Sequence, residues 1–194
     1  GYQKVAANVI AMDGTNWFSS FTIDKGSKEG IKKGMNVIAG SGLVGIVTDV
    51  GPNFAKVRSI IDDSSNVSSM VLTTKDNFNV GGSLKSMNQD KVLPYTELRD
   101  EDDKVKVGDP VVTSYVSDQY QEGILIGYIA SIEKNANNLT KSGTITPVVD
   151  FQHLREVLVI TTLKDTGEKE LSSQKASDTQ TETQDNTETQ KSQE

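Results

Sequence analysis

Short runs of Val, Ile, Thr and Phe recur along the first 164 residues, and Gly, Asn, Asp or Ser interrupts them every few positions. Residues 20–24 and 55–60 alternate polar and apolar side chains, which is the period of a half-buried strand. Residues 35–38 and 43–50 flank a glycine turn and so predict a hairpin. Helical turns are predicted in only two places, residues 27–30 and 153–155. This pattern restricts the chain to an all-β fold, either a sandwich or small barrels.

Three segments of the first half have a counterpart in the second half. The pairs are 33–38 with 107–112, 42–50 with 123–132, and 55–61 with 144–149. This weak internal similarity predicts two small antiparallel barrels, although a single larger sandwich fits the composition nearly as well. In both copies a Gly precedes a hairpin arm or lies within it, where it permits a bulge, a positive φ or a tight bend. The structural turn glycines are Gly26, Gly30, Gly34, Gly42, Gly45, Gly108, Gly123 and Gly127.

The end of the chain differs from the rest in charge. Residues 165–194 carry three Lys against eight Asp and Glu, and their only apolar side chains are Leu171 and Ala176. Such a segment buries too little apolar area to offset its chain entropy, so we predict a disordered tail that acts as a spacer. A partner-binding tail is the alternative. The net charge of −7 over the whole chain excludes a nucleic-acid binder, which needs a basic face.

Missing residue types remove further function classes. The chain has no Cys and one His, so disulfides, zinc-thiolate sites, thiol nucleophiles and sites built from two imidazoles are excluded. No apolar run approaches the roughly 18 residues that a membrane span needs, and residues 1–4 lack the apolar core of a signal peptide. We predict no metal and no cofactor.

The remaining polar clusters predict little chemistry. Asp62, Asp63 and the acids in 100–103 are interpreted as solvated turn residues, because their spacing does not match a calcium loop. A serine triad would need His153, but no Gly-x-Ser-x-Gly elbow is present, and His153 is interpreted as structural or solvent-facing. The glycines of residues 40–45 lead into a strand, so the helix that assists phosphate loops is missing.

Aromatic residues beside turns are the candidate partner contacts. Trp17 and Phe18 follow the Asp-Gly turn at 13–14, where a barrel-capping contact is the favoured interpretation and a binding site the alternative. Tyr115 and Tyr120 lie in a loop between two predicted strands, and aromatic side chains near loop tips are typical of protein-binding faces. The residues alone therefore indicate an all-β, non-enzymatic binding or scaffold domain.

Several segments taken in order resemble the extracytoplasmic part of the rod shape-determining protein MreC family. They are residues 16–18, 21–27, 30–38, 42–45, 108–114, 123–127, 147–151 and 154–160. Their order and spacing across residues 5–162 carry the resemblance, since no single segment is diagnostic. Residues 115–121 depart from the Gly-rich, Phe-Pro-like loop that is usual in the family, so a partner contact through this loop would differ here.

The resemblance implies two antiparallel barrels of about six strands each, with an outline like the chymotrypsin double barrel but without its catalytic residues. We expect residues 1–8 to end an N-terminal helix or linker, residues 9–66 to form the first barrel and residues 67–163 the second. Exchange of strands between the barrels is left open. The disordered acidic tail is expected over residues 164–194.

The resemblance also implies a non-catalytic scaffold of the cell-elongation machinery, which maintains cell shape during peptidoglycan synthesis. Implied partners are class B penicillin-binding proteins, MreD and other elongation proteins, with self-association as dimers or filaments. The implied location is the outer face of the cytoplasmic membrane, anchored by a transmembrane helix that this chain lacks, and zero Cys suits a Gram-positive source. The alternatives are a serine-hydrolase-like enzyme and a peptidoglycan-binding module, for which 6% aromatic residues leave little room.

Overall fold

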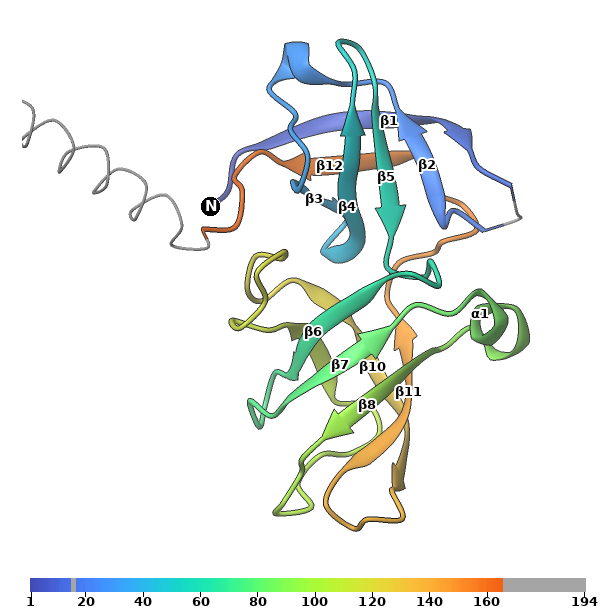
Figure 1. The fold of residues 1–194 in the computed structure, drawn as a ribbon, viewed down its shortest axis with the longest axis vertical. Coiled ribbons are helices and arrows are strands. Elements are labelled where there is room, and N and C mark those ends of the chain that lie inside the picture. Colours follow the sequence, from blue (N-terminus) through green and yellow to red (C-terminus); the bar gives the residue numbers. More distant parts are fainter. Residues whose placement is uncertain (15–16, 166–194) are drawn as a thin grey trace, which may run out of the picture. The chain divides into compact units, whose positions relative to one another are not determined.

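A computed structural model of the chain describes residues 1–14 and 17–165, and Figure 1 traces their fold. Strands of this part of the chain join into one sheet whose hydrogen-bonded order closes on itself twice. The result is an all-β fold with two barrels, as predicted. Residues 166–194 of the predicted disordered tail lie outside the described residues.

The first barrel is a ring of six antiparallel strands. Around the ring they are β4 (Gly42–Val50), β3 (Asn36–Ala39), β12 (Glu156–Ile160), β1 (Lys4–Met12), β2 (Ser20–Ile23) and β5 (Ala55–Ser59), which pairs back with β4. Inward positions alternate along the short strands, so that Phe21 and Ile23 of β2 and Ala55 and Val57 of β5 are fully buried. The alternation of polar and apolar residues in the sequence therefore corresponds to the outward and inward positions of these strands.

The second barrel has the same plan. Around its ring the strands are β6 (Asn66–Val71), β7 (Asn77–Gly81), β8 (Leu93–Leu98), β11 (Lys141–Pro147), β10 (Leu125–Lys134) and β9 (Pro110–Thr113), which pairs back with β6. Phe78 and Tyr95 pack edge to face in its core with ring centroids 5.2 Å apart. The buried Tyr95 hydroxyl donates to the Ser131 carbonyl at 2.7 Å, as a buried phenol requires.

The two barrels exchange their sixth strands. By their pairing partners, the five strands from β1 through β5 correspond in order to the five from β7 through β11. Strand β12 corresponds to β6, because β12 pairs with β1 and β3 while β6 pairs with β7 and β9. In chain order, the strand that follows β5 closes the second barrel, and the strand that follows β11 closes the first. Figure 1 shows β12 between β1 and β3, far along the chain from both.

Two expected boundaries differ from the structure. Strand β1 begins at Lys4, so part of the segment expected to be a helix end or linker pairs with β12 instead. Residues 156–160, expected in the second barrel, form β12 of the first barrel. The reason is that β1 and β3 would each keep an unpaired edge without β12, and closing the ring removes both edges.

Helical structure matches the expectation at one place and departs from it at two. A 3-10 turn covers Ser27–Glu29, as predicted, whereas residues 153–155 form no helix. The α-helix α1 (Leu84–Asp90) was not predicted. Ser83 caps it by accepting from the Ser86 N–H at 3.1 Å, and Asp63 accepts from the Leu84 N–H at 2.8 Å. These oxygens satisfy donors that the first turn cannot pair internally.

Two glycines allow neighbouring strands to approach closely. A Cβ on Gly45 of β4 would lie 2.0 Å from the Arg58 carbonyl oxygen of β5, and one on Gly127 of β10 would lie 2.1 Å from the Thr146 carbonyl oxygen of β11. Positive φ angles occur at four of the other predicted turn glycines, Gly30, Gly34, Gly108 and Gly123. Gly26 and Gly42 instead pack against Gly51 and against Val148 and Val149.

Candidate functional site

The four aromatic residues proposed as partner contacts fall into two groups. Trp17 is 5% exposed and Tyr120 is 2% exposed, so neither side chain is available on the surface of this structure. Trp17 lies in the core and its indole N–H donates to Asn88 of α1. Burial raises the pKa of Tyr120 to about 12. Both residues therefore serve in packing in this structure, which agrees with the barrel-capping interpretation of Trp17, and Phe18 and Tyr115 remain as the surface candidates among the four.

Tyr120 is buried because its loop crosses to the first barrel. The buried side chain of Asn36 in β3 donates to the Gln119 carbonyl at 2.9 Å and accepts from the Gln121 N–H at 2.8 Å. Asn36 thus pairs with a segment of the other barrel as a neighbouring strand would. Sequence reasoning missed it, since one Asn in a predicted strand carries no signal of a contact about 85 residues away.

Phe18 lines a groove beside β1. We call this hollow of about 530 Å³ the β1 groove, and its apolar lining includes Ile10, Met12, Phe18 and Leu154. Ile10 is 59% exposed and Met12 is 40% exposed. The Phe18 ring packs edge to face on Phe21 of the core, with centroids 6.2 Å apart, which holds it in place at the groove.

The backbone beside the β1 groove has an open side. Residues 4–8 of β1 pair with β12, whereas residues 9–12 pair with β2. Beyond the β12 ladder, the Val9 N–H still donates to the Arg155 carbonyl. Within the described residues, β1 therefore ends as an edge strand next to exposed apolar side chains. An edge of this kind accepts an added strand from another chain.

Two other apolar surfaces lie on or beside the second barrel. Tyr115 and Val116 are more than half exposed at one loop. Leu72, Val107 and Tyr128, all exposed, form what we call the second-barrel patch. Pro110 joins them, because the Leu72 N–H donates to its carbonyl and Tyr128 lies opposite it across β9 and β10. Clustered exposed apolar side chains often mark interaction sites.

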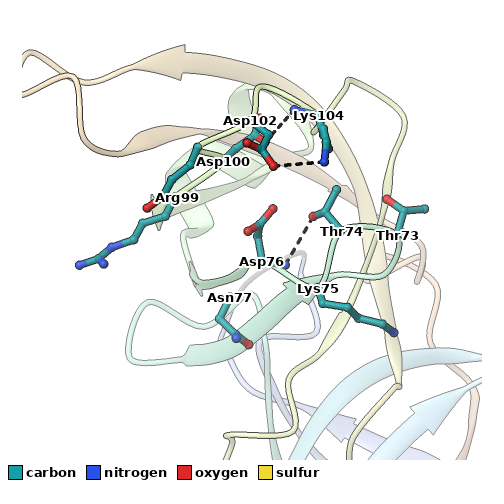
Figure 2. Close-up of a pocket in the computed structure, with 10 residues that line it drawn as sticks. Thr73, Thr74, Lys75, Asp76, Asn77, Arg99, Asp100, Asp102 and Lys104 are labelled. Atoms are coloured by element: carbon teal, nitrogen blue, oxygen red, sulfur yellow. Dashed lines mark hydrogen bonds and ion pairs between the residues drawn. The ribbon is translucent and has the colours of Figure 1, made fainter.

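A polar hollow of about 680 Å³ lies between the turn after β6 and the loop after β8. Figure 2 shows its lining, in which the Lys75 and Arg99 side chains point outward while Asp100 and Asp102 bind Lys104. Four acids and three bases line it, and no nucleophile there is paired with a base. The hollow is a junction of turns and offers no catalytic arrangement.

One acid at that hollow is not a solvated turn residue, contrary to expectation. The Asp100 side chain is 1% exposed and lies 2.8 Å from Nζ of Lys141. It also accepts from the Lys104 and Val105 N–H groups at 2.8 and 3.1 Å. Burial alone would raise the pKa of Asp100, but these hydrogen bonds outweigh it and hold the pKa below 3.8. The same pairing raises the pKa of Lys141.

The histidine tested for a serine triad lies as expected. His153 is solvent-facing, its Nδ1 2.8 Å from Asp150, and the hydrogen bond from His153 lowers the pKa of Asp150. No serine hydroxyl among the described residues bonds to His153, so the hydrolase alternative gains no support. The described part of the chain also holds no group of three His, Cys, Asp or Glu residues that could bind a metal, and none of its helices is long and apolar enough for a bilayer.

Known proteins resemble this fold and sequence. The family model "Rod shape-determining protein MreC, barrel core" matches residues 9–161. A curated relative, the cell shape-determining protein MreC of Listeria monocytogenes, is 34% identical over 82% of the chain. A solved MreC structure from the same species is similar with a TM-score of 0.73 at 33% identity, over 86% of this chain and 80% of that one.

A third similarity concerns the fold alone. A structure of a complex between penicillin-binding protein PBP2 and MreC from Helicobacter pylori has a TM-score of 0.60 at 12% identity and covers 82% of this chain and all of that one. The curated relatives are longer than this chain, which spans 54% of the Listeria protein. They are named as cell shape-determining proteins and not as enzymes.

Proposed function

Because this chain belongs to the rod shape-determining protein MreC family, we propose that it is a scaffold of the cell-elongation machinery that binds a class B penicillin-binding protein through the β1 groove. MreD, other elongation proteins and further copies of the chain are proposed as additional partners. We place the barrels on the outer face of the cytoplasmic membrane, anchored by an N-terminal transmembrane helix outside this chain.

The observation that carries the proposal is the coincidence of a groove, exposed apolar side chains and an open strand edge at one place. The open side of β1 offers backbone hydrogen bonds to an extended segment, and Ile10, Met12 and Phe18 offer apolar contact to alternate side chains of that segment. The backbone hydrogen bonds at the open edge supply affinity, and the apolar contacts in the groove supply specificity. Together they suit an apolar, extended stretch of a partner protein.

The identity of the partner rests on a relative. The MreC of Helicobacter pylori was solved with penicillin-binding protein PBP2, and it shares the fold of this chain. The Tyr115 loop and the second-barrel patch are the competing surfaces, and none of their residues lines the β1 groove.

The test measures binding of the full chain to the extracytoplasmic part of a class B penicillin-binding protein by biolayer interferometry. Ile10→Asp places a charge in the β1 groove without disturbing the core, and we expect a loss of affinity of about tenfold or more. Leu139→Asp is the matched control, because Leu139 is 77% exposed on the turn between β10 and β11, and should bind like the unaltered chain.

Two further variants compare the surfaces. Tyr115→Ser and Tyr128→Ser remove exposed aromatic groups from the loop and from the second-barrel patch, and both should retain binding. Unchanged affinity in Ile10→Asp together with a loss in either tyrosine variant would move the partner site away from β1.

A further inference from the structure

A small hollow beside the first barrel collects positive charge. Its volume is about 360 Å³, and its charged lining consists of Lys33, Arg58, Lys164 and one acid, Asp118. These residues come from four places: the loop before β3, strand β5, the segment after β12, and the loop that carries Tyr120. We call it the basic hollow. Its three cations stand out in a chain whose net charge is −7.

The Arg58 side chain has an unused hydrogen-bond donor. Its Nε atom is buried and has no partner in the described structure, although buried N–H groups of proteins are almost always paired. Arg58 lies between Ser20 of β2 and Ile46 of β4 across the sheet, and the close approach at Gly45 fixes its backbone. Arg58 therefore lines the hollow with a guanidinium whose inner Nε–H donor is unpaired.

The cations of the basic hollow form no ion pair among the described residues. None of the ion pairs among the described residues involves Lys33, Arg58 or Lys164. Lys56 lies two residues before Arg58 on β5 and so faces the same side of the sheet. The hollow thus has three cations against one acid, Asp118, and none of the three cations is paired with it.

We infer that the basic hollow binds a phosphate group. A phosphate carries one to two negative charges and several acceptor oxygens, so it can accept from the terminal nitrogens of Arg58 while Lys33 and Lys164 supply charge. A single carboxylate would satisfy the fork of Arg58 and leave both lysines unpaired. No helix N-terminus contributes, so the site depends on these side chains alone.

The site belongs to the first barrel only. By strand register the second barrel places Val107, Tyr128 and Thr146 where the first has Lys33, Ile46 and Arg58. The second barrel therefore offers neither the guanidinium nor the lysine. This difference makes the second barrel an internal control, and the inference is independent of the β1 groove because the two share no lining residue.

The direct test is nuclear magnetic resonance of the arginine Nε–H signals of the full chain, titrated with inorganic phosphate at constant ionic strength. We expect the Arg58 signal to shift and saturate at millimolar phosphate, and acetate to shift it far less. Lys33→Gln should weaken phosphate binding about tenfold. Lys85→Gln, on the exposed face of α1, should leave it unchanged. Failure of phosphate to shift the signal, or an equal response to acetate, overturns the site.

Two arms separate the sources of the phosphate. Co-sedimentation with phosphatidylglycerol vesicles that is lost in Lys33→Gln and Arg58→Lys assigns the site to lipid headgroups. Binding of inorganic phosphate without co-sedimentation assigns it to free phosphate groups. Co-sedimentation that persists in both variants, with no Nε–H shift, contradicts the inference.

Discussion

In the first barrel the Gly34 N–H donates to the Val47 carbonyl, and in the second the Gly108 N–H donates to the Ile129 carbonyl. The correspondence continues through the strands. Val44 and Ile126 are the extra residues of one β-bulge, and Thr48 and Ala130 are the extra residues of the next. Backbone features that bend and close a barrel therefore occur at matching positions in both.

The outward side chains at matching positions differ. Asn36, Lys33 and Arg58 of the first barrel correspond to Pro110, Val107 and Thr146 of the second. In the first barrel these residues hold a loop and line the basic hollow, while in the second barrel they border an exposed apolar patch. The comparison teaches that closure of the barrel constrains the backbone and the inward residues, and leaves the outward face free to differ in function.

The largest effect should come from the two glycines that the barrels share. Gly45→Ala and Gly127→Ala each add a Cβ that would lie 2.0 or 2.1 Å from a backbone carbonyl oxygen, so paired strands must move apart. We expect each variant to lose more than about 3 kcal/mol of unfolding free energy, measured by urea denaturation. Retained stability in one variant only would show that the barrels differ in packing and not merely in surface.

The next effect is confined to the second barrel. Lys141→Met removes the partner of the buried Asp100 carboxylate and should cost about 3 kcal/mol at pH 7, because an uncompensated charge is left in the interior. The exposed pair between Lys104 and Asp102 provides the control, and Lys104→Met should cost less than about 0.5 kcal/mol. Equal losses would contradict the role given to burial.

The pH dependence of the same pair has a definite sign. The pKa of Asp100 in the folded chain lies below its ordinary value of 3.8. As the pH falls toward that range, the unfolded chain therefore binds more protons than the folded chain. The stabilisation by Asp100 is complete above that value and is lost as the pH falls through the lower, folded-state pKa. Lys141→Met removes the hydrogen bond and the charge with which Lys141 lowers the pKa of Asp100. That pKa therefore rises relative to the unaltered chain, and the cost of the substitution should shrink between pH 7 and pH 3. A constant cost over that range would argue against the assignment.

The smallest of these effects tests the contact between the barrels. Asn36→Ala removes the acceptor of the Gln121 N–H and the donor to the Gln119 carbonyl, and we expect a loss of about 2 kcal/mol. Pro110→Ala at the matching position of the second barrel should change stability by less than about 0.5 kcal/mol. The tyrosine fluorescence of Asn36→Ala should also change, because Tyr120 becomes more exposed. An unchanged fluorescence would indicate that other contacts hold the loop.

Much of the fold was predictable because strands and tight turns leave local marks in the sequence. The similarity of residues 42–50 to residues 123–132 anticipated β4 and β10, and the shared glycine of that pair is Gly45 with Gly127. The glycine spacing of three in one copy and four in the other has a simple explanation. Gly42 begins β4, whereas Gly123 has a φ of 82° before β10, so these two glycines are not equivalent.

The interaction surface was predictable only in part, since exposure is decided by residues distant in the chain. Of the proposed aromatics, Tyr115 is exposed and Phe18 lines the β1 groove, but Trp17 and Tyr120 are buried. Tyr120 lies among polar neighbours that predict a loop tip, whereas the contact with Asn36 holds that loop against the first barrel. The open edge of β1 likewise depends on where β12 begins, which no local pattern reports.

The exchange of sixth strands has a consequence for the order of events during biosynthesis. During synthesis, the chain emerges from the ribosome amino end first and presents β1 through β5 before the other strands. These strands remain an open sheet until residue 160 has been made, because β12 is the strand that closes their ring. The second barrel includes β6, which directly follows the five strands of the first barrel, and it can form only after residue 147, the end of β11, has been made. The amino-terminal barrel is therefore the last to close. Cutting the chain into two halves between β5 and β6 would leave the first barrel without its sixth strand, β12.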